Sequence, residues 1–153
     1  MEIKDAMRNI LEGDVLTNAL SFVDFVTEKG LNLKQEWDKG FRVVKNNKSL
    51  CMIILSENNQ NVGEWLIWEI PVASEPGWDS INNDLKDFII ANIKICDSNQ
   101  GKGCGSDPGS TKNIFGKSYD NVCTSELQFI NPGTDVLDKF KEVVEWWITN
   151  IAA

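Results

Sequence analysis

The sequence predicts an α+β domain with a small, mainly antiparallel sheet of about four strands and helices packed on one face. Three observations indicate this class. Apolar residues recur with helical spacing near both ends of the chain, residues 41–72 carry strand-type runs, and a further helix and strand follow. The expected order is therefore α-β-β-β-α-β-α. A chain of 153 residues suits a single globular domain over residues 1–153.

Residues 3–29 predict one helix or a broken pair of helices. Gly13 interrupts the apolar spacing, and a stronger apolar stripe follows over residues 15–26. Asp14 is placed to cap this stripe and Gly30 to end the helix.

A β-hairpin is predicted by two β-type runs, FRVVK and SLCMIIL, which flank the turn signal Asn46-Asn47. The next run, EWLIWEIPV, predicts a third strand. Pro71 lies near its end, which suits an edge strand or a strand terminus.

The second half of the chain predicts a helix over residues 81–95 and, after a long segment, a fourth strand with the sequence CTSELQFI. The turn residues 131–133 then lead into a final helix that Thr134 or Asp135 can cap. A broad apolar face on this helix must pack against the rest of the domain.

The composition excludes some classes of partner. The chain carries 15 Lys+Arg against 23 Asp+Glu, a net charge of -8, which opposes binding to the phosphates of nucleic acids. No apolar run is long enough to span a membrane, and the N-terminus lacks the apolar core of a secretory signal. We therefore expect a cytoplasmic protein with neither a nucleic-acid nor a membrane partner, whose four cysteines are reduced thiols.

The chain contains no histidine. Histidine is the usual general base near neutral pH and the commonest neutral metal ligand. Catalysis would have to use Asp, Glu, Lys, Cys or the single tyrosine, so a non-catalytic role is favoured.

The segment from Cys96 to Cys123 is rich in glycine and holds three of the thiols. A connection this long inside a compact domain is usually functional or disordered. Cys96, Cys104 and Cys123 could together bind zinc or form a redox site, although their spacing is wider than that of a zinc knuckle. Free or structural thiols are the alternative interpretation.

Six tryptophans form another informative group. Trp65 and Trp68 are three residues apart in one strand, which places them on opposite faces of the sheet. On the last helix Trp147 fits the core and Trp146 its border. Large aromatic side chains fill cores, and they also line ligand pockets and partner surfaces.

Four stretches resemble a group of small uncharacterised bacterial domains: GDVLTNALSFVDFV, GEWLIW, CGSDPGSTKNIFGKSYDNVC and LQFINPGTDVLDKFKEVVE. That group has a Cys/Gly loop and an IFGK-x-[FY]-DNVC box, and the resemblance covers most of the chain. It implies a bacterial, intracellular α+β domain and no function. The matching positions are Cys104, Pro108, Gly109, Phe115, Gly116, Lys117, Tyr119, Asp120, Asn121, Val122 and Cys123.

Together these features predict a non-catalytic module that binds or senses a small apolar or aromatic molecule in a pocket near the Cys/Gly loop. The residues expected to line it are Trp65, Trp68, Phe115, Lys117, Tyr119 and Asp120. No cofactor is expected under this hypothesis. Two alternatives stay open: a zinc or redox site at Cys96, Cys104 and Cys123, and a protein–protein interaction module, including a homo-oligomer.

Overall fold

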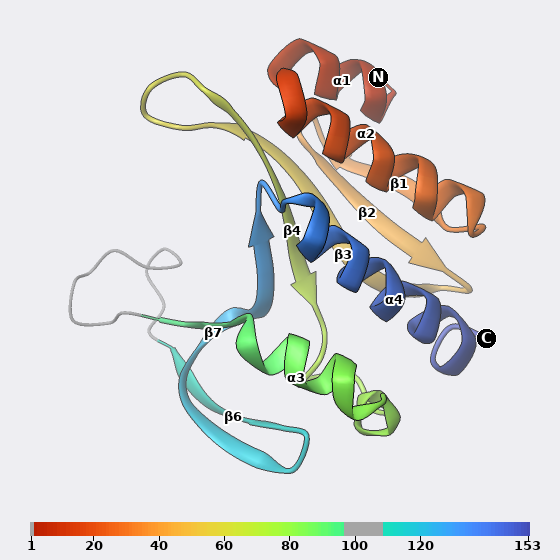
Figure 1. Cartoon of the computed structure of the whole chain (residues 1–153), viewed down its shortest axis with the longest axis vertical. Coiled ribbons are helices and arrows are strands. Elements are labelled where there is room, and N and C mark those ends of the chain that lie inside the picture. The colour runs from red at the N-terminus through yellow and green to blue at the C-terminus, as the bar shows by residue number, and fades with distance from the viewer. Residues whose placement is uncertain (1, 97–108) are drawn as a thin grey trace. The chain divides into compact units, whose positions relative to one another are not determined.

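The computed structural model describes residues 2–96 and 109–153 (Figure 1). Its helices are α1 (Ile3–Ile10), α2 (Gly13–Glu28), α3 (Asn83–Ala91) and α4 (Thr134–Asn150), with a short 3-10 helix η1 at Trp78–Ser80. Its strands are β1 (Asn32–Trp37), β2 (Gly40–Lys45), β3 (Lys48–Glu57), β4 (Gly63–Ile70), β5 (Ile93–Ile95), β6 (Ser110–Ile114) and β7 (Lys117–Ile130). The predicted α+β class is confirmed.

The strands follow the order β1-β2-β3-β4-β7-β5 in one sheet, and β6 pairs with β7 beside this path. The pairs β1–β2, β2–β3, β3–β4, β5–β7 and β6–β7 are all antiparallel. The sheet is therefore mainly antiparallel, as the sequence predicts. Within residues 2–96 and 109–153, no helix combines the length and the apolar character that crossing a bilayer requires.

The predicted number of strands and the predicted element order are wrong. The described chain has seven strands, whereas the two helices that precede the first strand match the broken pair predicted over residues 3–29. Strand β1 is not predicted by the sequence because five of its six residues are exposed and the strand therefore lacks apolar alternation. Strand β5 continues the apolar spacing of α3, so the sequence predicts a helix where the structure has this strand. Strand β6 lies in the segment that the sequence predicts to be a loop.

The local turn chemistry was easier to predict. Asn46 and Asn47 both have positive φ, 50° and 64°, as the two-residue turn between β2 and β3 requires. Gly30 has a φ of 81° and follows α2, so its predicted role at the end of that helix is confirmed. Asp14 does not cap α2, because Glu12 occupies the cap position and no side chain caps the helix.

The final helix also begins without the predicted cap. Gly133 is the residue that precedes α4, and no side chain, neither Thr134 nor Asp135, accepts a capping hydrogen bond. Asp135 still places a negative charge in the first turn, where it interacts favourably with the helix dipole.

The chain divides into two compact units. Unit 1 comprises Met1–Trp68 and Phe129–Ala153, and unit 2 comprises Glu69–Gln128. This division into units does not test whether residues 1–153 fold as one domain, so that statement stays a prediction. Each unit has its own buried residues and is described below by itself.

The core of unit 1 lies between α2, α4 and one face of the sheet. The Phe22 ring on α2 lies 5.9 Å from the Trp65 ring on β4 and 5.7 Å from the Phe140 ring on α4, centroid to centroid. Phe129 lies 5.3 Å from Phe140. Tilted aromatic pairs of this kind each contribute about 0.5–1.5 kcal/mol beyond the burial of their area. This aromatic cluster therefore holds both helices on the strands.

Strand register extends the same core across the sheet. Phe41 on β2 is paired with Ile53 on β3, and Ile53 with Ile67 on β4. All three side chains are buried. Residues paired across antiparallel strands point to the same face, so these three form an apolar row.

Unit 2 contains α3 and the hairpin of β6 and β7. The side chain of Asn82 accepts a hydrogen bond from the Leu85 amide at 2.9 Å and so caps α3. The two-residue turn of the hairpin is Phe115-Gly116, with φ values of 53° and 79°. Gly116 adopts this conformation at no steric cost.

Candidate functional site

The two tryptophans predicted to line a pocket belong to unit 1. Trp65 is fully buried in the aromatic core, where Phe22 packs against it, so its side chain is not available to a ligand. Trp68 is half-buried. Trp65 pairs with Leu55 and Trp68 with Met52, so the two side chains point to opposite faces, as predicted.

The other four predicted residues lie together on the β6–β7 hairpin of unit 2. The ammonium group of Lys86 lies 5.5 Å from the centre of the Phe115 ring, and that of Lys117 lies 5.5 Å from the centre of the Tyr119 ring. The hydroxyl of Thr111 donates a hydrogen bond to Asp120 at 3.1 Å. These four residues share the hairpin, and each has a local partner within unit 2.

The predicted thiol cluster is only partly described. Cys96 is buried and is not part of a disulfide, and Cys104 lies outside the described residues. Cys123 is bonded in a disulfide, so the expectation of reduced thiols is wrong for this cysteine. A sulfur in a disulfide has no thiolate to offer a metal ion. Across residues 2–96 and 109–153, no three His, Cys, Asp or Glu side chains gather in a way that could hold a metal.

Cys51 is a free thiol inside unit 1, on β3. Burial raises the pKa of this thiol far above its ordinary value, while the positive charge of Arg42 acts in the opposite direction. Since the thiolate is the reactive form, Cys51 is held as an inert apolar side chain.

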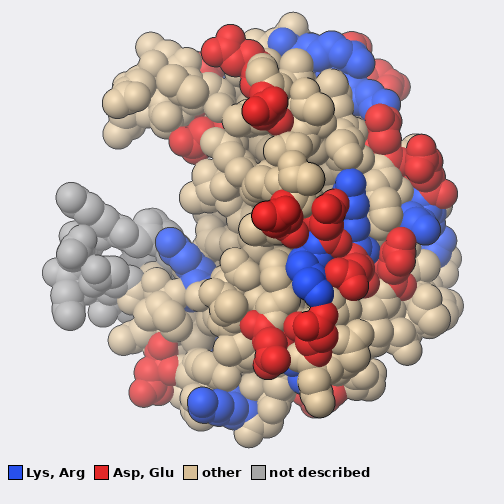
Figure 2. Space-filling model, in the orientation of Figure 1, with Lys and Arg blue, Asp and Glu red and all other residues tan. Residues whose placement is uncertain are grey.

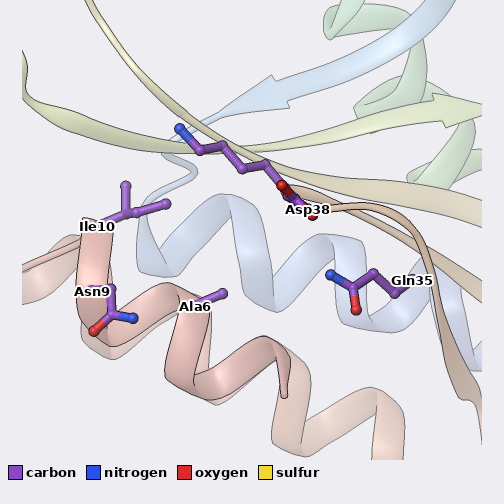
Figure 3. Close-up of a pocket in the computed structure, with 6 residues that line it drawn as sticks. Ala6, Asn9, Ile10, Gln35 and Asp38 are labelled. Carbon is purple, nitrogen blue, oxygen red and sulfur yellow. The ribbon is translucent and has the colours of Figure 1, made fainter. Parts of the chain in front are cut away.

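A cavity of about 330 Å³ lies in unit 1 between α1 and the turn that joins β1 to β2. Ala6, Asn9 and Ile10 line it from the helix, and Gln35, Asp38 and Lys39 line it from the hairpin. Figure 3 shows the labelled helix residues and the labelled hairpin residues on opposite sides of this space. Its volume falls at the lower end of the range of small-molecule sites, roughly 300–1,000 Å³.

Helical spacing explains the apolar part of the lining. Ala6 and Ile10 are four residues apart and lie on the same side of α1. Ala6 is buried and Ile10 is half-buried, so both are in place to contact an apolar group in the cavity.

Backbone contacts hold the two walls of the cavity. Gly63, at the start of β4, lies so close to the end of α1 that a Cβ atom there would be 1.9 Å from the Ile10 carbonyl oxygen. In the turn, the carbonyl oxygen of Lys39 accepts a hydrogen bond from the Leu55 amide at 2.8 Å. Both walls are therefore attached to ordered strands.

The polar part of the lining has unused bonding capacity. The side chains of Asn9, Gln35, Asp38 and Lys39 are exposed, and none forms a hydrogen bond or an ion pair with another residue that the structure describes. Two amides, one carboxylate and one ammonium group thus surround an apolar surface. This combination can bind a ligand that has both polar and apolar parts.

Trp37 directly precedes the cavity residue Asp38 in the sequence. It is 51% exposed, and its ring covers Gly40, where a Cβ atom would come within 2.3 Å of the ring. The glycine therefore leaves room for the indole at the hairpin end.

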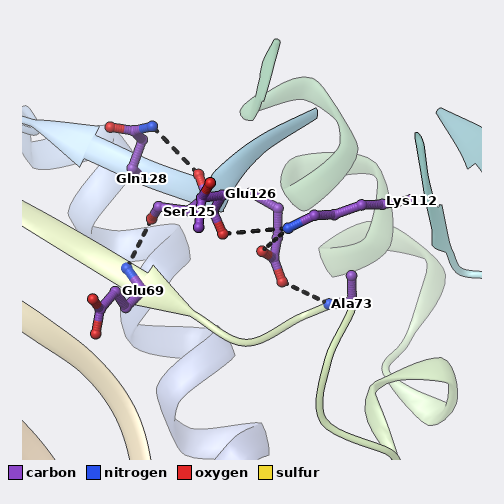
Figure 4. Close-up of polar contacts among 7 residues, drawn as sticks. Glu69, Ala73, Lys112, Ser125, Glu126 and Gln128 are labelled. Atoms are coloured by element: carbon purple, nitrogen blue, oxygen red, sulfur yellow. Dashed lines mark hydrogen bonds and ion pairs between the residues drawn. The ribbon is translucent and has the colours of Figure 1, made fainter. Parts of the chain in front are cut away.

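A second polar arrangement lies in unit 2 around the buried carboxylate of Glu126 (Figure 4). One oxygen accepts a hydrogen bond from the Ala73 amide at 2.9 Å, and the other forms an ion pair with Lys112 at 3.0 Å. Lys112 also donates to the carbonyl oxygen of Thr124 at 3.3 Å. Since both carboxylate oxygens are engaged, this arrangement acts as a structural clamp.

The neighbouring residue extends the clamp to the end of β4. The hydroxyl oxygen of Ser125 accepts a hydrogen bond from the Glu69 amide at 2.9 Å. Glu69 has a φ of 55°, which is unfavourable for a residue with a long side chain. The Ser125 contact is one of the interactions that hold this conformation.

Charged side chains of both signs are mixed over the face seen in Figure 2. The net charge of -8 therefore does not gather there as one acidic patch.

Sequence reasoning missed the cavity because its residues have no motif. Asn9, Gln35, Asp38 and Lys39 are ordinary exposed residues, and the strand that carries Gln35 was itself not predicted. The one sequence signal near this cavity is the run Trp37-Asp38-Lys39-Gly40, in which a tryptophan precedes two charged residues and a glycine.

Comparisons with family models, with curated proteins and with solved structures found no match to this chain. The resemblance to small uncharacterised bacterial domains therefore stays a prediction. The candidate site depends on the geometry of the cavity alone.

Proposed function

We propose that this protein is a non-catalytic module that binds a small molecule in the cavity between α1 and the β1–β2 turn. The observation that carries the proposal is the cavity itself, about 330 Å³ in volume, with an apolar wall and four polar side chains that have no described partner. The pocket expected near the Cys/Gly loop stays a prediction, since residues 97–108 lie outside the described residues, and of its expected lining Trp65 is enclosed in the core.

A binding role is favoured over catalysis by the chemistry of the lining. The cavity presents one carboxylate, one ammonium group and two amides, and the chain has no histidine. General acid–base catalysis near neutral pH usually needs a group with a pKa near 7. Recognition of a ligand needs only complementary donors, acceptors and apolar contact.

The test is a screen of small metabolites by two-dimensional amide NMR, with the melting temperature as a second readout. We expect ligands that bind to shift the amide signals of residues 6–10 and 35–39. Substitution Asn9→Trp should abolish these shifts, because an indole at this exposed position would fill the cavity. Arg8→Trp is the matched control, since Arg8 is exposed on the same helix but does not line the cavity.

The proposal fails if no compound in the screen shifts these signals in the folded wild-type protein. It also fails if Asn9→Trp and Arg8→Trp bind every ligand equally well. In both cases the cavity would be a packing feature between a helix and a hairpin.

The thiol alternative and the interaction-module alternative stay predictions. Neither has an observation in its favour among residues 2–96 and 109–153, and the disulfide at Cys123 would have to be reduced before this sulfur could bind zinc. Disulfides are rare in the cytoplasm, so the redox state of Cys123 in the purified protein also tests the expected cytoplasmic location.

A further inference from the structure

We infer that the ligand of this cavity is a small zwitterion with an aliphatic side chain, of the size and chemistry of a free aliphatic amino acid. The inference depends on the proposed function, because it assigns a ligand class to the same cavity. It is based on the charges, the amides and the apolar residues of the lining.

The two charges of the lining have opposite signs and lie on successive residues. Asp38 and Lys39 both face the cavity, and neither forms an ion pair with any residue that the structure describes. A carboxylate beside an ammonium group offers complementary partners for a ligand that carries both charges. Each charge of the ligand would then lie near one of opposite sign.

Ligands with a single charge fit the lining less well. A phosphate or another anion would be attracted by Lys39 and repelled by Asp38, in a protein with a net charge of -8. A simple cation would be attracted by Asp38 and repelled by Lys39. Only a ligand with both charges gains from both side chains.

The amides match the remaining polar atoms of such a ligand. Asn9 on α1 and Gln35 on β1 each offer an acceptor and two donors, and their side chains have no partner in the described part of the chain. They can hydrogen-bond to the ammonium hydrogens and the carboxylate oxygens that the two charged residues leave unpaired.

The apolar wall selects the side chain of the ligand. Ala6 and Ile10 are both aliphatic, and the cavity volume of about 330 Å³ is small for a site. A branched aliphatic group can lie against these two residues while its charged end reaches the hairpin. Figure 3 shows Ala6 and Ile10 on the helix and Asp38 across the cavity from them.

The experiment compares three probes by NMR titration of the full chain: L-leucine, N-acetyl-L-leucine, which lacks the positive charge, and L-leucinamide, which lacks the negative charge. Because exposed ion pairs are weak, we expect L-leucine to bind with a Kd on the order of 1 mM. Both single-charge probes should bind roughly three- to fivefold more weakly.

Two substitutions assign the charges. In Asp38→Asn the preference for L-leucine over N-acetyl-L-leucine should disappear, and in Lys39→Gln the preference over L-leucinamide should disappear. Asp14→Asn and Lys34→Gln are the matched controls, because they change the net charge equally at exposed positions outside the cavity. Both controls should keep the wild-type preferences.

The outcomes separate the inference from the proposed function. Equal affinity for the three probes in the wild-type protein, or preferences that survive in Asp38→Asn and Lys39→Gln, would overturn the zwitterion assignment. If none of the three probes binds while another compound of the screen shifts residues 6–10 and 35–39, the ligand class is wrong and the binding function stands. If no compound shifts these residues, both are wrong.

Discussion

Asn131 forms two hydrogen bonds with the backbone of Trp65. Its side-chain oxygen accepts from the Trp65 amide at 3.0 Å, and its own amide donates to the Trp65 carbonyl oxygen at 2.9 Å. Asn131 follows β7 with a φ of 44°, and Trp65 is a fully buried aromatic residue of β4. One turn residue thus satisfies both backbone groups of a buried core residue.

We predict that Asn131→Ala lowers the free energy of unfolding by about 2–3 kcal/mol, because the Trp65 amide loses its acceptor and alanine disfavours positive φ. Urea denaturation followed by circular dichroism measures the change. Asn61→Ala is the control, since Asn61 also has a positive φ of 57° but lies in an exposed turn. A loss at Asn131 no larger than that at Asn61 would show that the Trp65 bond contributes little.

The clamp around Glu126 makes a second prediction. Glu126→Gln keeps an acceptor for the Ala73 amide but leaves the partly buried Lys112 without its ion-pair partner. We expect a loss of about 1–3 kcal/mol in the free energy of unfolding. Lys112→Met combined with Glu126→Gln should recover part of it.

A double-mutant cycle on Glu126 and Lys112 measures their coupling directly. The exposed pair of Arg8 and Asp5, 3.3 Å apart, provides the comparison and should show a coupling close to zero. Equal coupling energies for the two pairs would rule out a special role for the buried clamp.

The close contact of Gly63 with α1 can be tested by adding one methyl group. In Gly63→Ala the new Cβ atom would lie 1.9 Å from the Ile10 carbonyl oxygen, so the helix or the strand must shift. We expect a loss of about 1–3 kcal/mol in the free energy of unfolding and weaker ligand binding in the adjacent cavity. Gly133→Ala is the control, because nothing lies within 4 Å of a Cβ atom there. Thermal denaturation and the NMR titration together measure both effects.

Cys51 predicts a specific dependence of stability on pH. Burial raises the pKa of its thiol in the folded state above the ordinary value of 9.0. Below pH 9.0 the thiol is protonated in both states, and above it only the unfolded state loses the proton. Stability should therefore fall as pH rises above this value, by about 1.4 kcal/mol per pH unit from this group.

The comparison of the wild-type protein with Cys51→Ala isolates this contribution from other groups that titrate at high pH. The difference in unfolding free energy between the two proteins should change between pH 8 and pH 10.5 in the direction that disfavours the wild type. A constant difference over this range would contradict the assignment. In the folded protein, Cys51 should also resist alkylation until denaturant is added.

Several elements of the fold could be predicted from local sequence patterns. The apolar stripe that leads to Phe22 predicted α2, and the pair Asn46-Asn47 predicted the turn between β2 and β3, because a two-residue hairpin turn needs residues that tolerate positive φ. The alternation of Trp65 and Trp68 correctly placed one ring in the core. In each case the signal and the structure lie within a few residues of each other.

The cavity could not be predicted from local sequence patterns. Four of the predicted ligand residues do lie on one hairpin, but the cavity lies in unit 1 at Ala6, Ile10 and the β1–β2 turn. Asn9 and Gln35 come from elements whose proximity depends on how α1 packs. No periodicity or motif encodes that distance.

Local sequence patterns specified the apolar stripe of α2, the turn at Asn46-Asn47 and the opposite orientations of Trp65 and Trp68, because periodicity and turn chemistry act over a few neighbouring residues. The strand formed by the polar segment at β1 and the cavity between α1 and the β1–β2 turn both depend on tertiary packing. An edge strand with exposed side chains is stabilised by backbone pairing with β2, and a cavity is the space left by two packed surfaces. Both depend on contacts between segments that the local pattern of residues does not specify.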